Sequence, residues 1–422
     1  MTISGLLRRA LGVGAVVTLL AGCGGTHSPL GGPGVPEMIA ARPAVQSPIE
    51  HVIVVVQQNR SFDSLFMGFP GADTTDHGYT HLGRIVPLKP ITLETNGKPG
   101  HGVTLPDTPP TFFQSYDSGK MNGFDLLHFG ANGNGPAAGL YPYAYVSHPE
   151  TRPYWELASQ YALADHMFST EIAGSFAANQ VLIAGSTVLD GKNYVVGVTH
   201  DGGCDAPRGT RTILSGGGFG PRPCFTWKTM ADLLDAKHVA WKYYSLLCSG
   251  QYADKGCRWD AFEAIKSVRY GPDWTRNVSV PNTNVFDDLK QPGFPAVAWI
   301  TPSLANSDYA MSGSKSGPAW VASIVDAVKH SSYWKSTAVV VVWGDWGGYY
   351  DHVPPPFFDN TGLGFRVPMI VVSPYVKRHS ISHTQYEFGS ILKFIEQNWG
   401  LGSLGNTDER ATSIAGMFDF TR

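Results

Sequence analysis

Three polar positions that are far apart in the sequence could together form one catalytic site: a serine at 175, an asparagine at 59 and an aspartate at 345. Ser175 opens a predicted helix, where free backbone N–H groups and the helix dipole favour an anion. Asn59 and Asp345 each follow an apolar run that predicts a buried strand. Ligands of open α/β sheets bind outside the carboxyl ends of the strands. We therefore expect the three groups to converge on one anion-sized hollow.

The elements that must position these residues alternate along the chain. Apolar, β-branched runs predict buried strands at 51–56, 194–198, 239–244, 296–300, 338–343 and 367–372. Helical spacing of apolar residues predicts helices at 154–164, 177–184, 227–236, 319–328 and 388–398. This alternation indicates an α/β fold with a mostly parallel central sheet and helices on both faces. The stretch 71–149 is rich in Gly, Pro and His, has weak periodicity, and predicts a loop-rich insertion or cap.

The composition limits the classes of function. Of the 422 residues, 43% are hydrophobic and 15% charged, which allows a large buried core and argues against a disordered chain or a coiled coil. Thirty-one Lys and Arg stand against 34 Asp and Glu, giving a formal net charge of −3. That balance supplies no basic field for a polyphosphate backbone, so nucleic acid is not an expected partner.

Several short strings, in a shared order along most of the mature chain, resemble one known family. They are 54–63 (VVVQQNRSFD), 119–124 (GKMNGF), 161–165 (YALAD), 317–321 (GPAWV), 347–356 (GGYYDHVPPP) and 362–368 (GLGFRVP). The family is the bacterial phosphoesterase family that includes non-haemolytic phospholipases C and respiratory-burst-inhibiting acid phosphatases. The resemblance implies an alkaline-phosphatase-like α/β fold that hydrolyses phosphate esters, with small phosphate esters or phospholipids as substrates.

The resemblance also implies roles for individual residues. Ser175 matches the family nucleophile, which would form a phosphoseryl intermediate that water then cleaves. A serine alcohol is a poor nucleophile at neutral pH, so it needs a base or a metal ion. One divalent metal ion is implied, at positions matched by Asn59, Asp345 and Gln58, and oxygen ligands of this sort suit a hard cation. The remaining site positions, expected to contact substrate, are Tyr309, Asn179 and His352.

The sequence departs from the family pattern at several of these positions. Gln58 stands where the family usually has Glu, and Gly344 where it has an acidic residue. Tyr309 replaces a histidine of a Ser-Asp-His segment, and a tyrosine with a pKa near 10 cannot replace an imidazole as proton carrier. A histidine expected near 105–108 has no clear counterpart. These losses leave one carboxylate at the expected metal site. The alternative function is therefore a weakened or inactive pseudoenzyme that serves as a surface binding protein.

The first 23 residues have the features of an export signal. Arg8 and Arg9 precede an apolar stretch that is too short for a membrane span and ends at Cys23. Small residues before this cysteine resemble a bacterial lipobox. We expect residues 1–23 to be a lipoprotein-type signal peptide with lipidation at Cys23, an ordinary cleaved signal being the alternative.

This organisation predicts where the protein acts. Residues 24–47, rich in Gly, Pro and Ala, are expected to form a tether, and 48–422 the phosphoesterase domain. No later segment offers 18 uninterrupted apolar residues, so any attachment to a membrane is expected to be through lipid alone. We expect an exported protein, either secreted or anchored on the periplasmic or cell-surface side.

Four further cysteines predict disulfides, because an even number in an exported chain is typical of a cross-linked fold. They are Cys204, Cys224, Cys248 and Cys257. Three connectivities are possible, and we favour 204 with 224 and 248 with 257, since each pair encloses a short Gly-rich loop. Neither pair has the tight spacing of a zinc cluster.

Overall fold

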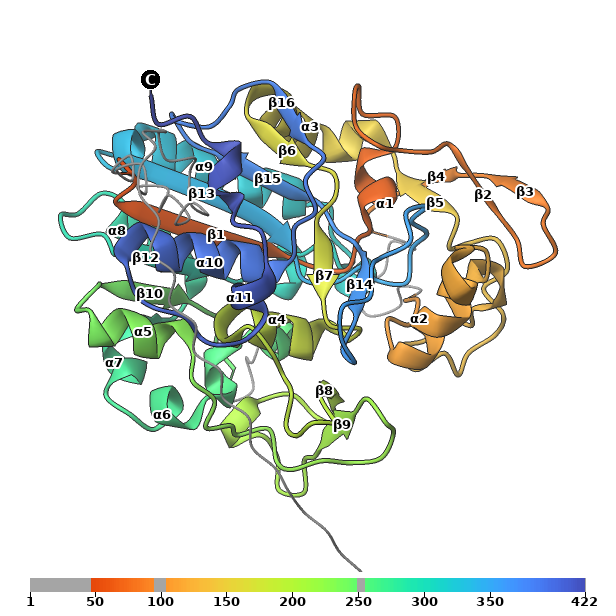
Figure 1. Cartoon of the computed structure of the whole chain (residues 1–422), viewed down its shortest axis with the longest axis horizontal. Helices are drawn as coiled ribbons and strands as arrows, with labels where there is room; N and C mark the ends of the chain where they lie inside the picture. Colours follow the sequence, from red (N-terminus) through yellow and green to blue (C-terminus); the bar gives the residue numbers. More distant parts are fainter. Residues whose placement is uncertain (1–46, 95–103, 249–254, 422) are drawn as a thin grey trace, which may run out of the picture. The chain divides into compact units, whose positions relative to one another are not determined.

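The computed structural model describes residues 47–94, 104–248 and 255–421. The expected signal peptide, Cys23 and residues 24–46 of the expected tether lie outside the described residues. Within these residues a central sheet has the strand order β11-β10-β12-β1-β13-β15-β6-β16 (Figure 1). The bounds of these strands are β1 His51–Gln57, β6 Ala162–Ala164, β10 Trp241–Tyr244, β11 Val278–Ser279, β12 Val297–Ile300, β13 Thr337–Trp343, β15 Met369–Val372 and β16 Ser380–Ser382.

The centre of this sheet is parallel and fully covered. β1 pairs in parallel with both β12 and β13, with Val52 opposite Val297 and Ala338. Every residue of β1 and β13 is buried, as expected for valine-rich strands covered on both faces. β15 runs antiparallel to β13 and to β6. The predicted α/β fold with a mostly parallel sheet is confirmed.

Helices cover both faces of the sheet (Figure 1). α3 (His148–Gln160) packs against α9 (Gly317–His330) on one face, and α4 (Ser175–Ala184) packs against α10 (Phe388–Trp399) on the other. α10 begins at a capping box between Glu387 and Ser390 and ends at the left-handed Gly400. The other helices are α1 Phe62–Phe66, α2 Pro109–Tyr116, α5 Met230–Ala236, α6 Lys266–Arg269, α7 Asp273–Asn277, α8 Val285–Asp288 and α11 Thr407–Arg410. None of the helices among the described residues has the length and apolar character needed to cross a bilayer.

Two sequence predictions of elements are wrong. The helix expected over 154–164 ends at Gln160, and Ala162–Ala164 form strand β6 of the central sheet, because pairing with β15 and β16 overrides the helical preference of this short apolar segment. The strand expected at 194–198 forms, as β8 (Val195–Val198), but it pairs with β9 (Thr212–Leu214) in a separate two-stranded sheet. The apolar sequence predicted a fully buried strand of the central sheet, but only the first two residues of β8 are buried.

The stretch expected to be an insertion forms short elements around an apolar cluster of its own. Its described strands are β2 His77–Tyr79, β3 Ile85–Pro87, β4 Lys89–Ile91 and β5 Ala144–Val146, and helix α2 lies with them. Phe112 of α2 packs on Trp346 and Phe365, with ring centroids 5.7 and 4.5 Å apart. Phe365 belongs to β14 (Leu363–Arg366), which pairs with β7 (Phe168–Thr170). The cluster therefore joins the insertion to the loop that follows β13.

Candidate active site

Ser175 lies at the first position of α4, and its hydroxyl points at two other predicted site residues. Its Oγ donates a hydrogen bond to Asp345 Oδ2 at 2.7 Å and lies 3.5 Å from Asn59 Oδ1. Asn59 Nδ2 donates to Asp345 Oδ1 at 2.8 Å. Asn179, one turn along α4, donates from Nδ2 to the Ser175 carbonyl at 2.9 Å. The structure thus brings the hydroxyl, the amide and the carboxylate together, and places Asn179 beneath the serine.

A fourth residue, Asp107, completes this cluster, and the sequence did not single it out. It precedes α2 in the insertion, and its Oδ2 accepts a hydrogen bond from Asn59 Nδ2 at 3.2 Å. Burial raises the pKa of both Asp107 and Asp345, and the charge of Asp107 raises that of Asp345 further. Two buried carboxyls held this close share a proton unless a cation neutralises them. In the sequence, Asp107 stands shortly before two prolines, and this pattern is equally typical of the start of a helix.

Two glycines allow the three segments to meet. Gly347 has a φ of +61°, and a Cβ there would lie 2.3 Å from the backbone oxygen of Asn59. Gly348 has a φ of +76°, and a Cβ there would lie 2.9 Å from the backbone oxygen of Pro106. Only glycine permits both the left-handed turn and such close approach. The pair therefore brings the backbones that carry Asn59 and Asp107 against the loop that carries Asp345.

Gln58 is fully buried beside the cluster, yet neither its side-chain nitrogen nor its side-chain oxygen has a hydrogen-bond partner. It faces the space left by Gly344: a Cβ on that glycine would lie 3.1 Å from Gln58 Oε1 and 3.5 Å from Asn179 Nδ2. An unpaired buried amide is costly. The structure thus puts an unsatisfied amide beside the cluster, at the position that the sequence assigned to a metal ligand.

The donor set fits a hard divalent cation. The hydrogen bonds within the cluster are 2.7 to 3.5 Å long. They join the carboxylates of Asp345 and Asp107, the Asn59 amide and the Ser175 hydroxyl. Oxygen ligands about 2.1 Å from an octahedral cation are about 3 Å from one another. The amide nitrogen and oxygen of an asparagine are interchangeable by a flip, so the Asn59 oxygen, which lies near Ser175 Oγ, could turn toward the two carboxyls. The structure thus brings a second carboxylate, that of Asp107, into a cluster for which the sequence indicated only one.

Among the described residues, two other groups of acidic, histidine or cysteine side chains lie close enough together to hold a metal ion. Both groups already have other partners. In the first, Asp63, Asp351 and His352 surround the guanidinium of Arg366, which donates to Asp351 Oδ1 at 2.8 Å. In the second, Asp260 and Glu263 lie beside Cys248, whose sulfur is oxidised in a disulfide.

His352 belongs to the first of these groups, and the structure does not bring it to Ser175. Its Nδ1 lies 2.7 Å from Asp63 Oδ2 and its Nε2 lies 3.1 Å from Asp73 Oδ1. Burial alone would lower the pKa of His352, but the hydrogen bond and charge of Asp63 outweigh burial and raise the pKa to about 9. The imidazolium therefore stabilises the fold together with Arg366.

This shift predicts a loss of stability in mild alkali. A raised folded-state pKa contributes stability that is fully present below pH 6.5, the unfolded value, and is lost as the pH rises through about 9. We expect the free energy of unfolding to fall by about 3 kcal/mol across this window. Urea unfolding at intervals from pH 6 to pH 9.5 measures the change. The His352→Gln variant should show a flatter profile, and an identical profile in both proteins would contradict the assignment.

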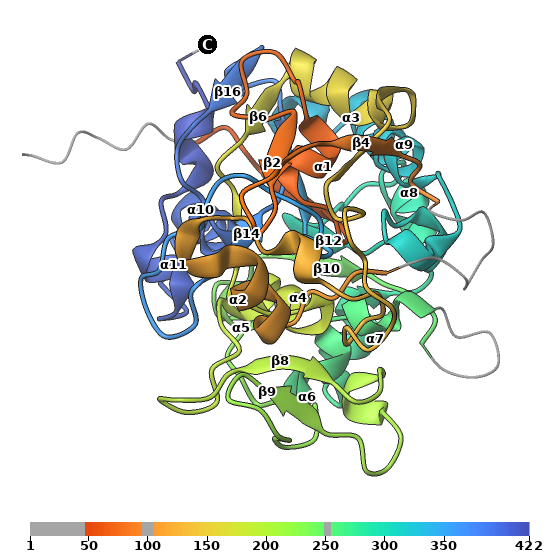
Figure 2. The same cartoon turned by 90° about the vertical axis from the view of Figure 1, so that its right-hand side faces the viewer.

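A cavity of about 630 Å³ opens beside the cluster. Ser175, Asn59, Asp107 and Tyr309 line it, whereas Gln58, Asn179, Asp345 and His352 are not among its lining residues. Burial raises the pKa of Tyr309, so its hydroxyl stays protonated at neutral pH and can donate a hydrogen bond. Figure 2 shows α2 and the β8–β9 hairpin facing the viewer, and residues from both line the cavity.

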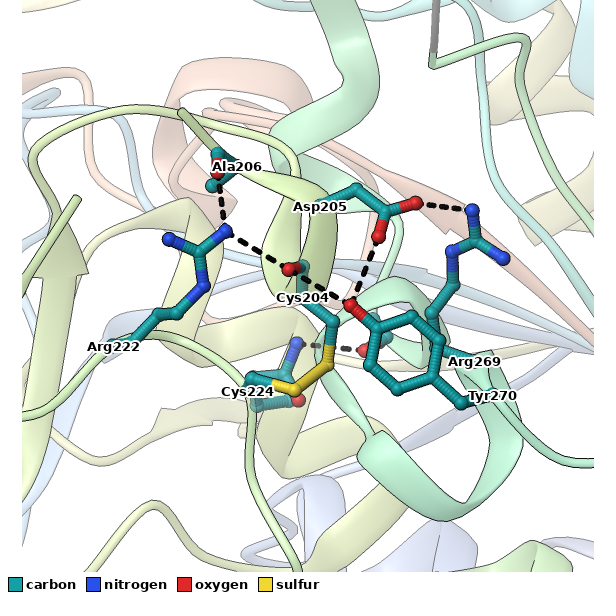
Figure 3. Close-up of a disulfide and its surroundings, with 9 residues drawn as sticks. Cys204, Asp205, Ala206, Arg222, Cys224, Arg269 and Tyr270 are labelled. Atoms are coloured by element: carbon teal, nitrogen blue, oxygen red, sulfur yellow. Dashed lines mark hydrogen bonds and ion pairs between the residues drawn. A yellow bond between two sulfur atoms is a disulfide. The ribbon is translucent and has the colours of Figure 1, made fainter. Parts of the chain in front are cut away.

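Disulfides hold two segments of the cavity wall. Cys204 and Cys224 are bonded, and so are Cys248 and Cys257, which confirms the favoured pairing. The first bond closes a loop that begins shortly after the end of β8 and contains β9. Figure 3 shows this bond with Arg222 and Tyr270, which both donate to the Cys204 carbonyl. Closing a loop of this length stabilises a fold by about 3 kcal/mol.

The chain is similar to solved structures and to characterised relatives. An alkaline phosphatase superfamily protein from Vibrio parahaemolyticus is 10% identical, with a TM-score of 0.39 over 87% of this chain and 71% of that chain. The phosphonate monoester hydrolase of Agrobacterium radiobacter is 9% identical, with a TM-score of 0.38 over 87% of this chain and 77% of that chain.

Relatives known from sequence are phospholipases. Phospholipase C A of Mycobacterium tuberculosis is 24% identical over 84% of this chain and 73% of the relative. The non-hemolytic phospholipase C of Pseudomonas aeruginosa is 23% identical over 84% of this chain and 54% of the relative. A sequence model of the Phosphoesterase family matches residues 49–402, most of the chain. The protein with this cluster of serine, amide and paired carboxyls is therefore a member of the Phosphoesterase family.

Proposed function

We propose that this protein hydrolyses phosphate esters, with Ser175 as the nucleophile and one divalent cation held by Asp345, Asp107 and Asn59. The observation that carries the proposal is the 2.7 Å hydrogen bond from Ser175 Oγ to Asp345 at the wall of the cavity. Membership of the family and the phospholipase C relatives support hydrolysis of phosphate esters.

The residues divide the work of the reaction. Asp345 accepts the proton of the Ser175 hydroxyl as Oγ attacks phosphorus, so that the Oγ–P bond forms while the ester P–O bond breaks. The leaving oxygen takes up a proton from solvent and departs as the alcohol, and Asp345 later returns its proton to Oγ. Water then cleaves the phosphoseryl bond, releasing phosphate and restoring the hydroxyl. Tyr309 would donate a hydrogen bond to a phosphoryl oxygen in place of its 3.5 Å contact with Met311 Sδ. A bound cation would keep both carboxyls ionised and would offset the charge that develops on oxygen.

A second candidate function is a protein that binds a phosphate ester without cleaving it. The hydrogen bonds of Asn59 Nδ2 to both Asp107 and Asp345 favour it, because an amide that donates to both carboxyls occupies the oxygens that a cation would need. Gln58 and Gly344 also lack the charge that a tightly bound cation requires.

One experiment separates the two candidates. The purified full chain is freed of metal, then supplied in turn with Mg²⁺, Mn²⁺, Ca²⁺ and Zn²⁺, and the release of nitrophenol from an aryl phosphate and an aryl phosphocholine is measured. Cation-dependent turnover of either ester supports hydrolysis. Binding of inorganic phosphate with no turnover under any of these conditions would support the second candidate instead.

We also propose that the protein is exported and held to a membrane through lipid on Cys23. The two disulfides support an oxidising compartment. The expected result is that the wild-type protein is found in the membrane fraction of bacteria and that the Cys23→Ala variant is not. A protein that stays in the membrane fraction without Cys23 would refute the lipid anchor.

A further inference from the structure

Arg258 is the one lysine or arginine among the described residues that line the cavity. It belongs to the 3-10 helix η4 (Lys255–Trp259), and its side chain is 41% exposed. Within the described residues its hydrogen bonding is a single contact, from Nη2 to Asp201 Oδ2 at 3.3 Å. A guanidinium has five N–H donors in a planar fork. Most of these donors are therefore available to a ligand in the cavity.

The charge of Arg258 acts on the same groups that surround Ser175. It lowers the pKa of Asp107 against the dominant effect of burial, and it does the same for Tyr309. Asp107 in turn lies 3.2 Å from Asn59, which contacts Asp345. The helix η4 that carries the guanidinium packs against α4, which carries Ser175, and both side chains line the same cavity.

The carboxylates that line the cavity are already engaged. Asp107 faces Asn59 and Asp345, and Asp201 is paired with Arg258. Much of the wall that β8 and β9 contribute is apolar, including Val196, Val198, Ile213 and Leu214. A negative charge near Ser175 therefore has a guanidinium to meet, whereas the carboxylates on the described wall that an ammonium could meet, Asp107 and Asp201, each already have a hydrogen-bond partner.

We propose that Arg258 binds the non-bridging oxygens of the phosphate at Ser175 and makes the site selective for dianionic phosphomonoesters over phosphocholine diesters. This inference rests on the proposed function. A guanidinium binds two phosphate oxygens at once, and a charged pair of this kind is about twice as strong as a neutral hydrogen bond. A monoester dianion offers more charge to this contact than a diester monoanion does. The neighbouring Cys248–Cys257 bond fixes the chain immediately before the guanidinium.

Steady-state kinetics on four proteins test the selectivity: wild type, Arg258→Gln, Arg258→Lys and Arg208→Gln. Arg208 is an exposed arginine outside the cavity and controls for the lost positive charge. For Arg258→Gln we expect the KM for an aryl phosphate to rise about tenfold, with less than about a threefold change for an aryl phosphocholine. Arg258→Lys should recover part of the loss. Equal changes for the two esters, or an equal effect of Arg208→Gln, would overturn the proposal.

Calorimetry of inorganic phosphate binding separates this inference from the proposed function, because it needs no turnover. We expect Arg258→Gln to weaken phosphate binding about tenfold, whether or not the wild type hydrolyses an ester. If the wild type turns over an aryl phosphate while Arg258→Gln binds phosphate unchanged, the role of Arg258 is refuted and the proposed function stands. If the wild type is inert but Arg258→Gln loses phosphate affinity, the proposed function fails and the phosphate contact stands.

Discussion

Replacing Ser175 with alanine is expected to reduce kcat for an aryl phosphate by at least about 10³-fold while leaving phosphate binding within a few-fold of the wild type. The hydroxyl is the group that would form the covalent bond to phosphorus, and its partner Asp345 cannot attack in its place without producing a different intermediate. The fold should be unaffected, because the α4 N-cap position is Gly174 and the Ser175 side chain does not cap the helix. Nitrophenol release under saturating substrate measures the change.

Two further measurements make this result decisive. Mass spectrometry of an acid-quenched reaction should find phosphate on the peptide that contains Ser175, and on no other. Ser159→Ala, which removes an exposed hydroxyl from α3, should retain wild-type kcat. Turnover by Ser175→Ala at a rate near that of the wild type would eliminate the serine mechanism, even though the family assignment would remain.

Asp107→Asn is expected to weaken the binding of Mn²⁺ or Mg²⁺ at least about tenfold. The substitution keeps the size and the hydrogen bonding of the side chain but removes one of two negative charges that would neutralise the cation. It also removes the repulsion between two buried carboxyls, so the free energy of unfolding without metal should rise rather than fall. Calorimetry of the metal-free full chain measures affinity, and urea unfolding measures stability.

Variants at three other positions serve as comparisons for this prediction. Asp117→Asn removes an aspartate that follows α2 and pairs with Lys120 on the surface, so cation affinity should be unchanged. Gln58→Glu adds a carboxylate at the buried, unpaired amide, so affinity should increase. If Asp345→Asn abolishes binding while Asp107→Asn leaves it intact, Asp107 is not a ligand.

The parts of the fold that follow from local pattern were predictable. The valine runs of β1 and β13 are unambiguous, because only a strand covered on both faces accommodates so many β-branched residues in sequence. The segment 162–164 was not predictable, since its three small or apolar residues continue the helical pattern of α3 and become a strand only through pairing with β15. The partner of β8 was equally hidden, because strand pairing depends on contacts across the chain.

The same difference between local pattern and long-range contact explains which residues of the site could be predicted from the sequence. Ser175 opens a recognisable helix and Asp345 follows a recognisable strand, so their positions at the edge of the sheet could be inferred. Asp107 and Arg258 could not, because each reaches the cavity through long-range folding: Asp107 through packing of the insertion, and Arg258 through a segment closed by a disulfide. Neither has a local pattern that distinguishes a site residue from an ordinary surface charge.

The adjacent glycines at 347 and 348 have a consequence for how this site can be altered. The spacing between the three backbones is set by main-chain contact, so side chains within the hollow can be exchanged without moving the scaffold that presents them. A carboxylate supplied from a different segment can then serve the same hollow, which Asp107 lines. Variants that alter the chemistry of this hollow should therefore change its side chains and leave the two glycines untouched.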